Sequence, residues 1–380
     1  MIDIVRGLIG MAAIVGLAYM FSNNRKHIDW RLVAIGLGIQ FVLAVFILKG
    51  RDMAEFWSPL GWPKEIFAWI SSFFVIVLDF TAEGAEVIFG DLGKSPGMEG
   101  SVGSFFAFQV LPTIVFFASL TAILYHYGIL QRLVKYMARG MQKLMGTSGA
   151  ESLSVISNIF VGQTEAPLVV KPYIERMTKS ELLAVMTGGM ATIAGGVMAA
   201  YVQMLGNSYA QAQGVGLDVG RLLFAEQLLG ASIMAAPAAL VIAKMLYPEV
   251  EEPVTKGDVR VQIEQTDANG IDAAASGAAV GLRLAANVGA MLLAFIALLA
   301  MGNYFLESFG NLTGINSLIP DSELRIETLL GWIFAPVAWI VGVPWADATS
   351  MGSLLGTKVV LNEFVAYLQL SEMVGAEALS

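Results

Sequence analysis

The stretch Val155-Ile-Ser-Asn-Ile-Phe-Val-Gly-Gln-Thr-Glu-Ala-Pro-Leu-Val-Val170 is an apolar segment with a polar interruption in its middle. The interruption places an amide, a hydroxyl and a carboxylate side by side, at Gln163, Thr164 and Glu165. Within a membrane such groups are costly, and they occur where something polar must be held. Proline cannot continue a helix but fits the first turn of a new one, so Pro167 predicts that one half-helix ends and another begins here.

The composition identifies the chain as a membrane protein. Of its 380 residues, 56% are hydrophobic and 14% are charged, whereas soluble domains carry roughly 25% charged residues. We therefore predict an all-α polytopic membrane protein embedded in the lipid bilayer. The net charge of -9 is set by loop residues and says little about partners, and no basic patch suggests nucleic-acid binding. Cysteine is absent, which excludes disulfides and thiolate metal sites.

Apolar runs long enough to cross the hydrocarbon core, about 20 residues each, define the predicted membrane helices. They cover residues 4–21, 32–48, 105–124, 182–205, 222–246 and 273–301, with a polar-interrupted run at 349–370. In residues 66–88 the uncharged run ends at Asp79 after about a dozen residues, which is too short to span, so we expect this segment to be interfacial. Gly277 and Gly281 have the spacing of small residues that lets helices pack closely.

The distribution of lysine and arginine orients the predicted spans. With the N-terminus outside and residues 66–88 interfacial, most basic residues fall on the inner side, as the positive-inside rule requires. Residues 130–144 carry basic side chains against apolar positions and are predicted to form an amphipathic surface helix. The basic residues of this segment are Arg132, Lys135, Arg139 and Lys143. Residues 250–269 are polar and lack a period, so they are predicted to be a loop.

A second interrupted segment, residues 329–344, repeats the pattern of the first. It contains Ala335-Pro336 where the first contains Ala166-Pro167, and we predict that each segment is a re-entrant helical hairpin broken at its Ala-Pro pair. About 28 residues after each proline comes a helix loosened by small and polar residues, and paired segments of this kind mark transporter binding sites at a repeat interface. The loosening residues are Gly188, Gly189, Thr192, Gly195 and Gly196 in the first copy and Gly352, Gly356, Thr357, Asn362 and Glu363 in the second. Basic flanks on the first hairpin and acidic flanks on the second predict inverted repeats.

The predicted organisation divides the chain into five segments. Residues 1–50 form two N-terminal transmembrane helices, and residues 51–147 form an interfacial helix, a scaffold transmembrane helix and the amphipathic surface helix. Residues 148–247 form the first transport repeat, with a hairpin, a broken helix and a further helix. Residues 248–320 form the polar loop and a long scaffold helix. Residues 321–380 form the second transport repeat, with a hairpin and a broken helix; its final helix would begin beyond Ser380, so we expect the chain to lack it.

Four stretches of the chain resemble the concentrative nucleoside transporter family. Gly162-Gln-Thr-Glu-Ala-Pro-Leu-Val-Val170 and Asn362-Glu-Phe-Val-Ala-Tyr367 are similar to its two signature motifs, in the same order and separation. Ala191-Thr-Ile-Ala-Gly-Gly196 and Gly331-Trp-Ile-Phe-Ala-Pro336 are similar to segments that lie between them. The resemblance covers nearly the whole chain and is to the short bacterial, sodium-coupled members, which continue past the position of Ser380 into a region with further sugar-binding residues.

The resemblance implies a function and an assembly. It implies a multi-pass transporter of the bacterial inner (plasma) membrane, not an enzyme, that imports nucleosides such as uridine together with Na+ by alternating access. It also implies a homotrimer.

The resemblance further implies the substrate-binding residues. Gln163, Thr164 and Glu165 would contact the nucleobase, for which their mixed donors and acceptors are suited, and Val197 would be a further contact. Glu363 would accept hydrogen bonds from the ribose, because a carboxylate can accept from two adjacent hydroxyl groups. From the residues alone two alternatives stay open. Residues 163–165 could cap broken helix ends, and Glu363 could be a structural acid paired with Lys358.

Sodium is the expected coupling ion. Asn158 offers an amide oxygen and Thr192 a hydroxyl, and the carbonyls of Val161, Thr192 and Ile193 at the helix breaks would complete an oxygen shell. The resemblance points to the same positions. One alternative is that Asn158 and Thr192 only join helices by hydrogen bonds. Another is proton coupling through Glu165 or Glu363, because burial raises the pKa of a carboxyl group.

Two other function classes compete with a symporter. An intramembrane hydrolase would use Glu165 and Glu363 as general acid and base, but no nucleophile with an adjacent base accompanies them in the sequence. ATP-driven transport finds no support in Gly93-Lys94-Ser95, because Ile88 occupies the position where a phosphate-binding loop requires glycine. A sodium-coupled nucleoside symporter is therefore the function that we expect.

Overall fold

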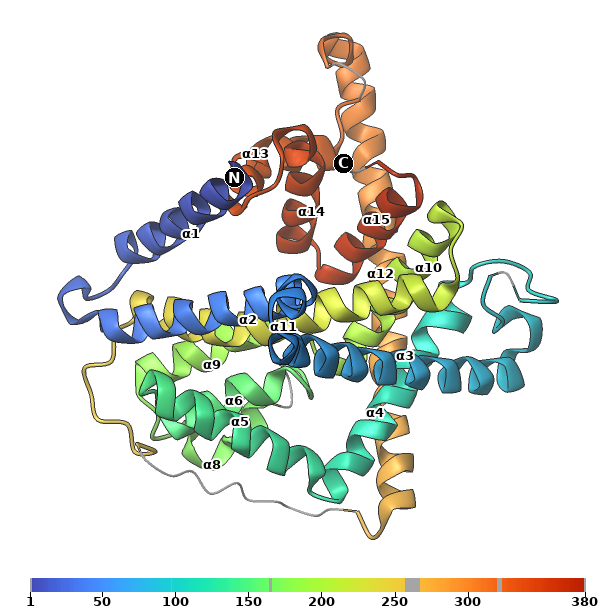
Figure 1. Cartoon of the computed structure of the whole chain (residues 1–380). Helices are drawn as coiled ribbons and strands as arrows, with labels where there is room; N and C mark the ends of the chain where they lie inside the picture. Colours follow the sequence, from blue (N-terminus) through green and yellow to red (C-terminus); the bar gives the residue numbers. More distant parts are fainter. Residues whose placement is uncertain (1, 97, 164–165, 257–266, 320–322, 379–380) are drawn as a thin grey trace. The chain divides into compact units, whose positions relative to one another are not determined.

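The regular structure is helical throughout the residues that the computed structural model describes, which are 2–96, 98–163, 166–256, 267–319 and 323–378. The α-helices, labelled in Figure 1, are α1 (Ile2–Met20), α2 (Trp30–Phe56), α3 (Trp62–Phe89), α4 (Leu111–His126), α5 (Ile129–Met145), α6 (Gly149–Asn158), α7 (Ala166–Val169), α8 (Lys171–Ile174), α9 (Lys179–Ala191), α10 (Gly195–Gln213), α11 (Leu217–Leu246), α12 (Gly270–Thr313), α13 (Ile326–Val341), α14 (Ala348–Val360) and α15 (Glu363–Gly375). In these residues six helical segments are long and apolar enough to cross a membrane. The prediction of an all-α polytopic membrane protein is confirmed.

The chain forms two compact units. Unit 1 comprises Met1–Gly16, Met204–Gly220 and Ala285–Ser380, and unit 2 comprises Leu17–Gln203 and Arg221–Leu284. Unit 2 therefore contains the first interrupted segment and the break of the helix that follows it. Unit 1 contains the second interrupted segment and its own broken helix.

Most of the predicted spans coincide with observed helices. Apolar candidate spans run over Trp30–Gly50, Phe106–His126, Leu217–Leu246 and Gly270–Thr313, where the sequence predicts them. The span predicted at residues 182–205 is α9 followed by α10, with a break between them. The polar-interrupted run at residues 349–370 consists of α14 and α15, which are separate helices. At the N-terminus the described apolar helix is Arg6–Met20, which is shorter than the other spans.

The expectation that residues 66–88 are too short to span is wrong. Helix α3 is continuous through Asp79, and the segment Trp62–Leu92 is one of the candidate membrane spans. The physical reason lies on another helix: Arg221 of α11 is 2% exposed and donates a hydrogen bond of 3.0 Å to the Asp79 carboxylate. A paired carboxylate can be tolerated within an apolar helix where an isolated one would be costly. The interfacial placement of this segment stays a prediction.

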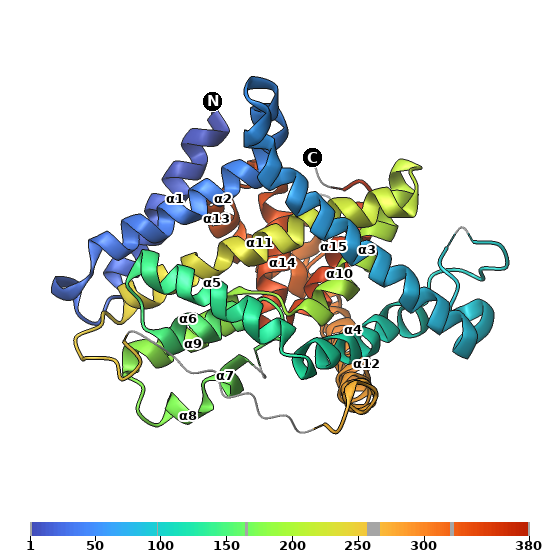
Figure 2. The same ribbon diagram turned by 60° about the horizontal axis from the view of Figure 1, so that its bottom comes forward.

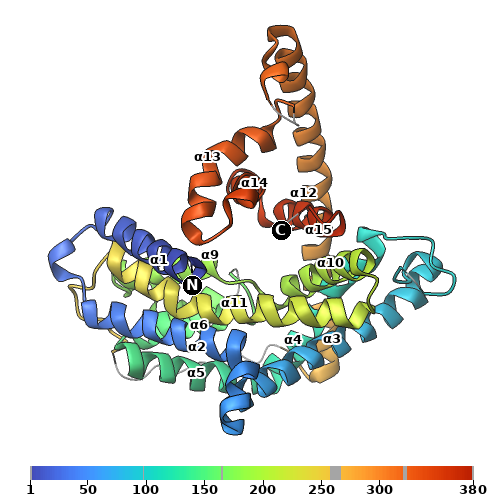
Figure 3. The same ribbon diagram turned by 45° about the horizontal axis from the view of Figure 1, so that its top comes forward.

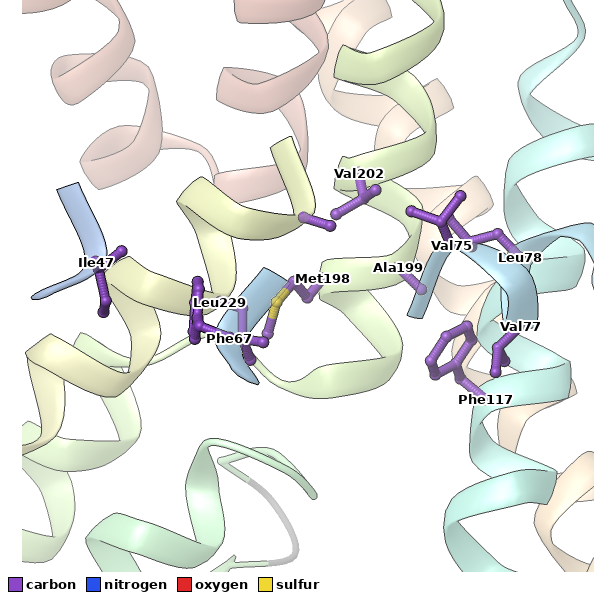
Figure 4. Close-up of a cluster of buried hydrophobic side chains, with 11 residues drawn as sticks. Ile47, Phe67, Val75, Val77, Leu78, Phe117, Met198, Ala199, Val202 and Leu229 are labelled. Atoms are coloured by element: carbon purple, nitrogen blue, oxygen red, sulfur yellow. The ribbon is translucent and has the colours of Figure 1, made fainter. Parts of the chain in front are cut away.

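A hydrophobic core in unit 2 joins α2, α3, α4, α10 and α11. Figure 4 shows it as a row of buried side chains, with Met198 of α10 near Phe67 of α3 and Leu229 of α11, and Phe117 of α4 facing Val77 of α3. The ring of Phe117 also packs against that of Phe74, with 4.8 Å between ring centroids. This packing fixes α10, and with it the break that precedes α10, to the long helices of the unit.

Close packing of α4 against the start of α12 confirms the prediction for Gly277 and Gly281. A Cβ atom at Gly277 would lie 2.6 Å from the Cβ of Ala122, and one at Gly281 would lie 2.7 Å from the Cβ of Ala118. Ser119 adds a hydrogen bond of 2.9 Å from its hydroxyl to the carbonyl of Ala274. The two glycines therefore let the backbones approach to a distance that a side chain would prevent.

In unit 1 the second hairpin turns at a different place from the one predicted. Helix α13 continues through Pro336, and the chain reverses after Gly342, whose φ is 119°. The break predicted at Ala335-Pro336 is therefore wrong. A proline removes one helical hydrogen bond but does not by itself reverse the chain, whereas a left-handed glycine does end a helix.

The reversal packs α14 directly against α13, as Figure 3 shows. A Cβ atom at Gly352 of α14 would lie 2.7 Å from the carbonyl oxygen of Gly331 and 2.7 Å from the backbone nitrogen of Ala335. These contacts need glycine on α14 because any side chain would separate the two backbones. The pair forms a tight helical hairpin in which glycine and alanine line the contact.

The two copies of the repeat share the position of their helix break. Helix α9 ends before Thr192 and helix α14 ends before Leu361, and these two residues stand at the same distance in sequence from Pro167 and Pro336. A new helix begins shortly after each break, at Gly195 and at Glu363. The internal repeat predicted from the sequence therefore has the same register in the structure, although the turn of its second hairpin differs.

The contact between α4 and α12 predicts the effect of Gly281→Ala. The added methyl group would overlap Ala118 and the backbone of Val115, so we expect a loss of about 1–3 kcal/mol in the free energy of unfolding. Gly84→Ala is the matched control, because nothing lies within 4 Å of a Cβ atom there, and it should be neutral or slightly stabilising. Thermal unfolding in detergent measures both; equal midpoints for the two variants would contradict the packing account.

Candidate functional site

The first hairpin breaks where the sequence predicts. Helix α6 is buried along its whole length and ends at Asn158. The chain then passes through Gly162, whose φ is 101°, and the backbone nitrogen of Ala166 donates a hydrogen bond of 2.9 Å to the Gly162 carbonyl. Pro167 lies in the first turn of α7. The predicted end of one half-helix and start of another is therefore confirmed.

A second break lies beside the first, in the connection between α9 and α10. Thr192 is extended and ends α9. The backbone nitrogen of Gly195, the first residue of α10, donates a hydrogen bond of 3.3 Å to the carbonyl of Phe160 in the first break. A Cβ atom at Gly195 would lie 2.9 Å from that carbonyl oxygen, and one at Gly162 would lie 2.9 Å from the Cβ of Ala194. The two breaks are in direct contact, and glycine on both sides makes the contact possible.

Asn158 joins the two breaks through its side chain. Its amide nitrogen donates hydrogen bonds to the carbonyl of Gly188, at 3.0 Å, and to the hydroxyl of Thr192. The Thr192 hydroxyl in turn donates a hydrogen bond of 3.1 Å to the same Gly188 carbonyl. Gly188 also allows α6 and α9 to approach, because a Cβ atom there would lie 2.6 Å from the side chain of Val155.

The amide oxygen of Asn158 is left without a hydrogen-bond partner in the described part of the chain, although the residue is 1% exposed. A buried polar group without a partner costs about 1–3 kcal/mol. A cation would remove this cost, because amide, hydroxyl and carbonyl oxygens are the ligands that helix breaks in transporters offer to sodium. The residues present therefore fit a sodium ion, and of the predicted ligands Asn158 and Thr192 are in contact. The hydrogen bond from Asn158 to Thr192 also joins α6 to α9, which agrees with the alternative that these two residues only connect helices.

Ile193 is held by a residue that the sequence analysis did not identify. The hydroxyl of Ser232, from α11, accepts a hydrogen bond of 3.2 Å from the backbone nitrogen of Ile193 and lies 3.3 Å from its carbonyl oxygen, to which it can donate. Ser232 is buried. It thus fixes the backbone between Thr192 and α10. The only signal in the sequence is a lone hydroxyl within an otherwise apolar stretch of α11.

The predicted nucleobase residues are described only in part. Gln163 is exposed, and a Cβ atom at Gly189 of α9 would lie 3.5 Å from its Cβ. Thr164 and Glu165 lie outside the described residues. Val197 is buried in the first turn of α10. Gln163 and Val197 are thus carried by the two segments that flank the contact between the breaks.

Glu363 belongs to unit 1 and is the first residue of α15. The preceding residue, Asn362, caps this helix by accepting a hydrogen bond of 2.9 Å from the backbone nitrogen of Val365. In the described residues no ion pair joins Glu363 to Lys358, which removes the support for a structural acid paired with that lysine. The carboxylate is partly exposed at the start of a helix, where negative charge is favoured.

A buried ionic cluster fixes the opposite ends of α6 and α9. Lys244 of α11 is paired with Glu151 of α6 at 2.8 Å and with Glu249 at 3.1 Å, and it donates a hydrogen bond of 3.0 Å to Ser180 of α9. Both helices begin with a capping box, Ser148 with Glu151 in α6 and Thr178 with Glu181 in α9. The cluster therefore ties the starts of α6 and α9 to the end of α11.

Burial dominates the electrostatics of Glu151. Removal from water raises the pKa of its carboxyl group, whereas the Lys244 ammonium and the backbone nitrogen of Ser148 act in the opposite direction. The Lys244 ammonium thus opposes the effect of burial on this carboxyl group. In the described residues no group of three acidic, histidine or cysteine side chains could hold a metal ion.

Three family models match the chain in succession. Residues 9–92 match the Na+ dependent nucleoside transporter N-terminus, residues 107–208 match the nucleoside recognition Gate domain, and residues 227–380 match the Na+ dependent nucleoside transporter C-terminus. Both breaks of the candidate site, at residues 158–166 and 192–195, fall within the Gate match.

Similar proteins come from bacteria and mammals. The chain is 40% identical over 377 residues to an uncharacterized transporter, YutK, of Bacillus subtilis, and covers 83% of it. It is 37% identical over 369 residues to the nucleoside permease NupC of Helicobacter pylori, and covers 80% of it. It is 39% identical to sodium/nucleoside cotransporter 1 of Mus musculus, of which it covers 51%. These alignments include 98%, 97% and 96% of the chain, respectively.

Solved structures of a transporter named CNTnw share the fold. The inward-facing, substrate-bound state matches with a TM-score of 0.78 and 43% identity, covering 97% of this chain and 79% of the other. A doubly substituted form in an outward-facing state matches with a TM-score of 0.81 and 43% identity, covering 98% and 81%.

The ionic cluster predicts the effect of Lys244→Met. Removing the cation leaves two carboxylates without their partner, one of them fully buried, so we expect a loss of about 3–5 kcal/mol in the free energy of unfolding. The Glu151 pKa would then lie further above its unfolded value. A carboxyl group with a raised pKa in the folded state stabilises the fold at low pH, and this contribution is lost as the pH rises. The loss of unfolding free energy in Lys244→Met, relative to the unmodified chain, should therefore be smaller at low pH.

Lys256→Met is the matched control for this variant. Lys256 forms an exposed pair with Glu252 at 3.6 Å, and such pairs contribute less than about 1 kcal/mol. Thermal unfolding of both variants at pH 5 and pH 8 tests the cluster. If Lys244→Met is destabilised as much or more at pH 5 than at pH 8, the proposed role of the Lys244 cluster is contradicted.

Proposed function

The chain belongs to the Na+ dependent, or concentrative, nucleoside transporter family, and from this premise we propose that it is a sodium-coupled symporter that imports nucleosides by alternating access. The observation that carries the proposal is the buried amide oxygen of Asn158, which has no partner in the described residues and lies where two helix breaks meet. Sodium/nucleoside cotransporter 1, which the chain resembles, is named for the same ion and substrate class.

The proposed ion site uses oxygens from both breaks. Asn158 and Val161 belong to the first break, and Thr192 and Ile193 belong to the second. A sodium ion bound by all four would lower the free energy of the arrangement in which the hairpin tip contacts the start of α10. The ion therefore stabilises the segments that carry Gln163 and Val197, and this is how binding of sodium would favour binding of a nucleoside.

The proposed substrate site has a base side and a sugar side. Gln163, Thr164 and Glu165 offer both donors and acceptors to the edge of a nucleobase, and Val197 offers an apolar contact. The roles of Thr164 and Glu165 rest on the sequence and the family alone. Glu363 would accept hydrogen bonds from ribose hydroxyls. Because the acceptor is a charged carboxylate, these hydrogen bonds would be stronger than those between neutral groups.

The setting of the protein follows from its relatives. Bacterial family members such as the NupC permease support a location in the bacterial inner membrane, and the resemblance to the family supports a homotrimer. Coupling to protons through Glu165 or Glu363 is the main alternative to sodium coupling. Replacing sodium by choline at constant pH separates the two.

The ion site predicts the effect of Asn158→Leu. The substitution keeps the branched shape of the side chain but removes the amide oxygen, together with the amide nitrogen that bonds to Gly188 and Thr192. Losing one contact to an ion costs about 1.5–3 kcal/mol, which is about a 10- to 150-fold weaker apparent affinity for sodium. Uridine uptake into proteoliposomes at varied sodium concentration, with choline as replacement at constant pH, measures this shift. Ser157→Ala is the control. The Ser157 hydroxyl, next to Asn158 in sequence, donates to the carbonyl of Leu153 within α6, so this variant should leave the sodium dependence unchanged. Uptake that persists undiminished in choline would refute sodium coupling.

The sugar side predicts the effect of Glu363→Gln. A neutral amide accepts weaker hydrogen bonds, so the affinity for uridine should fall by about tenfold or more. The affinity for 2′,3′-dideoxyuridine, which lacks both hydroxyls, should change little. Glu377→Gln is the control, since Glu377 is exposed and bonds to Gln213 at 2.8 Å. An equal loss for uridine and for the dideoxy analogue would show that Glu363 does not contact the ribose.

A further inference from the structure

Helix α5 carries its basic residues as a single stripe. Its sequence, Ile129–Met145, contains no acidic residue. Arg132, Lys135, Arg139 and Lys143 follow one another at intervals of three, four and four positions. At about 100° per residue, these positions fall within an arc of about 80° on the helix surface. The positive charge of this helix is therefore concentrated on one narrow face.

A second stripe beside the basic one is apolar and exposed. Leu133, Tyr136 and Leu144 are exposed by 45%, 70% and 58%, and the same rotation per residue places them next to the basic face. Large exposed apolar side chains in a row mark a surface that faces lipid or a partner. Tyrosine is typical of the boundary between the headgroups and the acyl chains.

The remaining face of α5 is packed against the protein. Leu130, Val134 and Ala138 are buried, and Leu130 and Val134 line a small space together with Leu153 of α6. Figure 2 shows α5 alongside α6. The helix thus has three sectors, of which one faces protein, one is apolar and exposed, and one is basic. This is the pattern of a helix that lies along a membrane surface.

Both ends of α5 meet membrane helices near their own ends. At the N-terminal end, α4 stops at His126, and a Cβ atom at Gly270, the first residue of α12, would lie 2.6 Å from the Tyr127 hydroxyl. At the C-terminal end, Met145 lies near Gly36 of α2, which is within about two turns of the start of that helix. The helix therefore runs close to one surface of the membrane and away from its centre.

Three of the four basic residues in the stripe are not paired with an acidic side chain in the described part of the chain. No acidic side chain there pairs with Arg132, Lys135 or Lys143. Arg139 has a further contact of its own. Three cations on one face, beside apolar side chains at the level where spans end, match the charge and the depth of phospholipid headgroups.

We propose that α5 is a binding face for anionic phospholipids, with the phosphate groups on the basic stripe and the acyl chains against Leu133, Tyr136 and Leu144. Each lysine or arginine near an anionic surface strengthens binding by about fivefold. Because α5 covers α6, which ends at Asn158, bound lipid would also hold in place the helix that carries the candidate ion ligand. This surface is independent of the transported substrate.

Lipid retention tests the proposal. The full chain is equilibrated with an equal mixture of phosphatidylglycerol and phosphatidylcholine, and the lipids retained on the protein are counted by native mass spectrometry. We expect enrichment in phosphatidylglycerol for the unmodified chain. In the triple variant Arg132→Gln, Lys135→Gln and Lys143→Gln, the enrichment in phosphatidylglycerol should fall by at least about tenfold. Raised salt should reduce the enrichment in the unmodified chain.

Two further variants keep the test decisive. Lys26→Gln, Arg31→Gln and Lys256→Gln together remove the same charge from exposed positions outside α5 and should leave the enrichment intact. Lys135→Arg with Lys143→Arg keeps the charge and should also keep it. Equal loss in the control triple variant, or full enrichment in the α5 triple variant with unchanged thermal unfolding, would overturn the proposal. Retention of both lipids in equal numbers by the unmodified chain would overturn it as well.

Discussion

The contact between the two helix breaks of unit 2 is the interaction on which the candidate site depends. A broken helix leaves backbone groups without partners, which is costly within a membrane. Here the breaks supply each other: Gly195 donates to the carbonyl of Phe160, and Asn158 donates to Gly188 and Thr192. One amide oxygen is left over. The two breaks therefore hydrogen-bond to each other, and one buried side-chain oxygen is left where a cation would be bound.

The opposite ends of the same two helices are fixed in a different way. The capping boxes of α6 and α9 satisfy the backbone nitrogens at their starts, and the Lys244 cluster joins both starts to α11. Ser232 adds a second attachment to α11 near the break. Because both ends of α6 and α9 are held, a change at the breaks would act on an otherwise rigid pair of helices. This suits a symporter, in which the ion must alter the substrate site rather than loosen the whole fold.

Features set by neighbours in sequence were predicted well. Pro167 identified the first break because a helix-starting proline acts locally, and the small and polar residues around Thr192 marked the second break. The same logic failed at Pro336, since a proline can remain inside a helix when the reversal is supplied elsewhere, here by Gly342. Local pattern alone does not decide between these outcomes.

Features that depend on distant partners were not predicted. Asp79 ends an uncharged run in the sequence, but α3 continues through it, and its partner, Arg221, lies on another helix. Ser232 and Lys244 were missed for the same reason, as both act across helices. The sequence does identify Asn158 and Thr192 as candidate ligands, but their direct hydrogen bond and their shared acceptor, the Gly188 carbonyl, are results of the fold. The relation of Glu363 to Gln163 stays a prediction from the family.

Hydrogen exchange is the most direct test of the claim that one ion is bound where the two breaks meet. Backbone exchange is followed by mass spectrometry in peptides that cover residues 155–163 and 188–196, with sodium or with choline at equal ionic strength and pH. The account predicts that sodium slows exchange in both segments together and over the same concentration range. Slowing in only one segment, or no difference between sodium and choline, would contradict it.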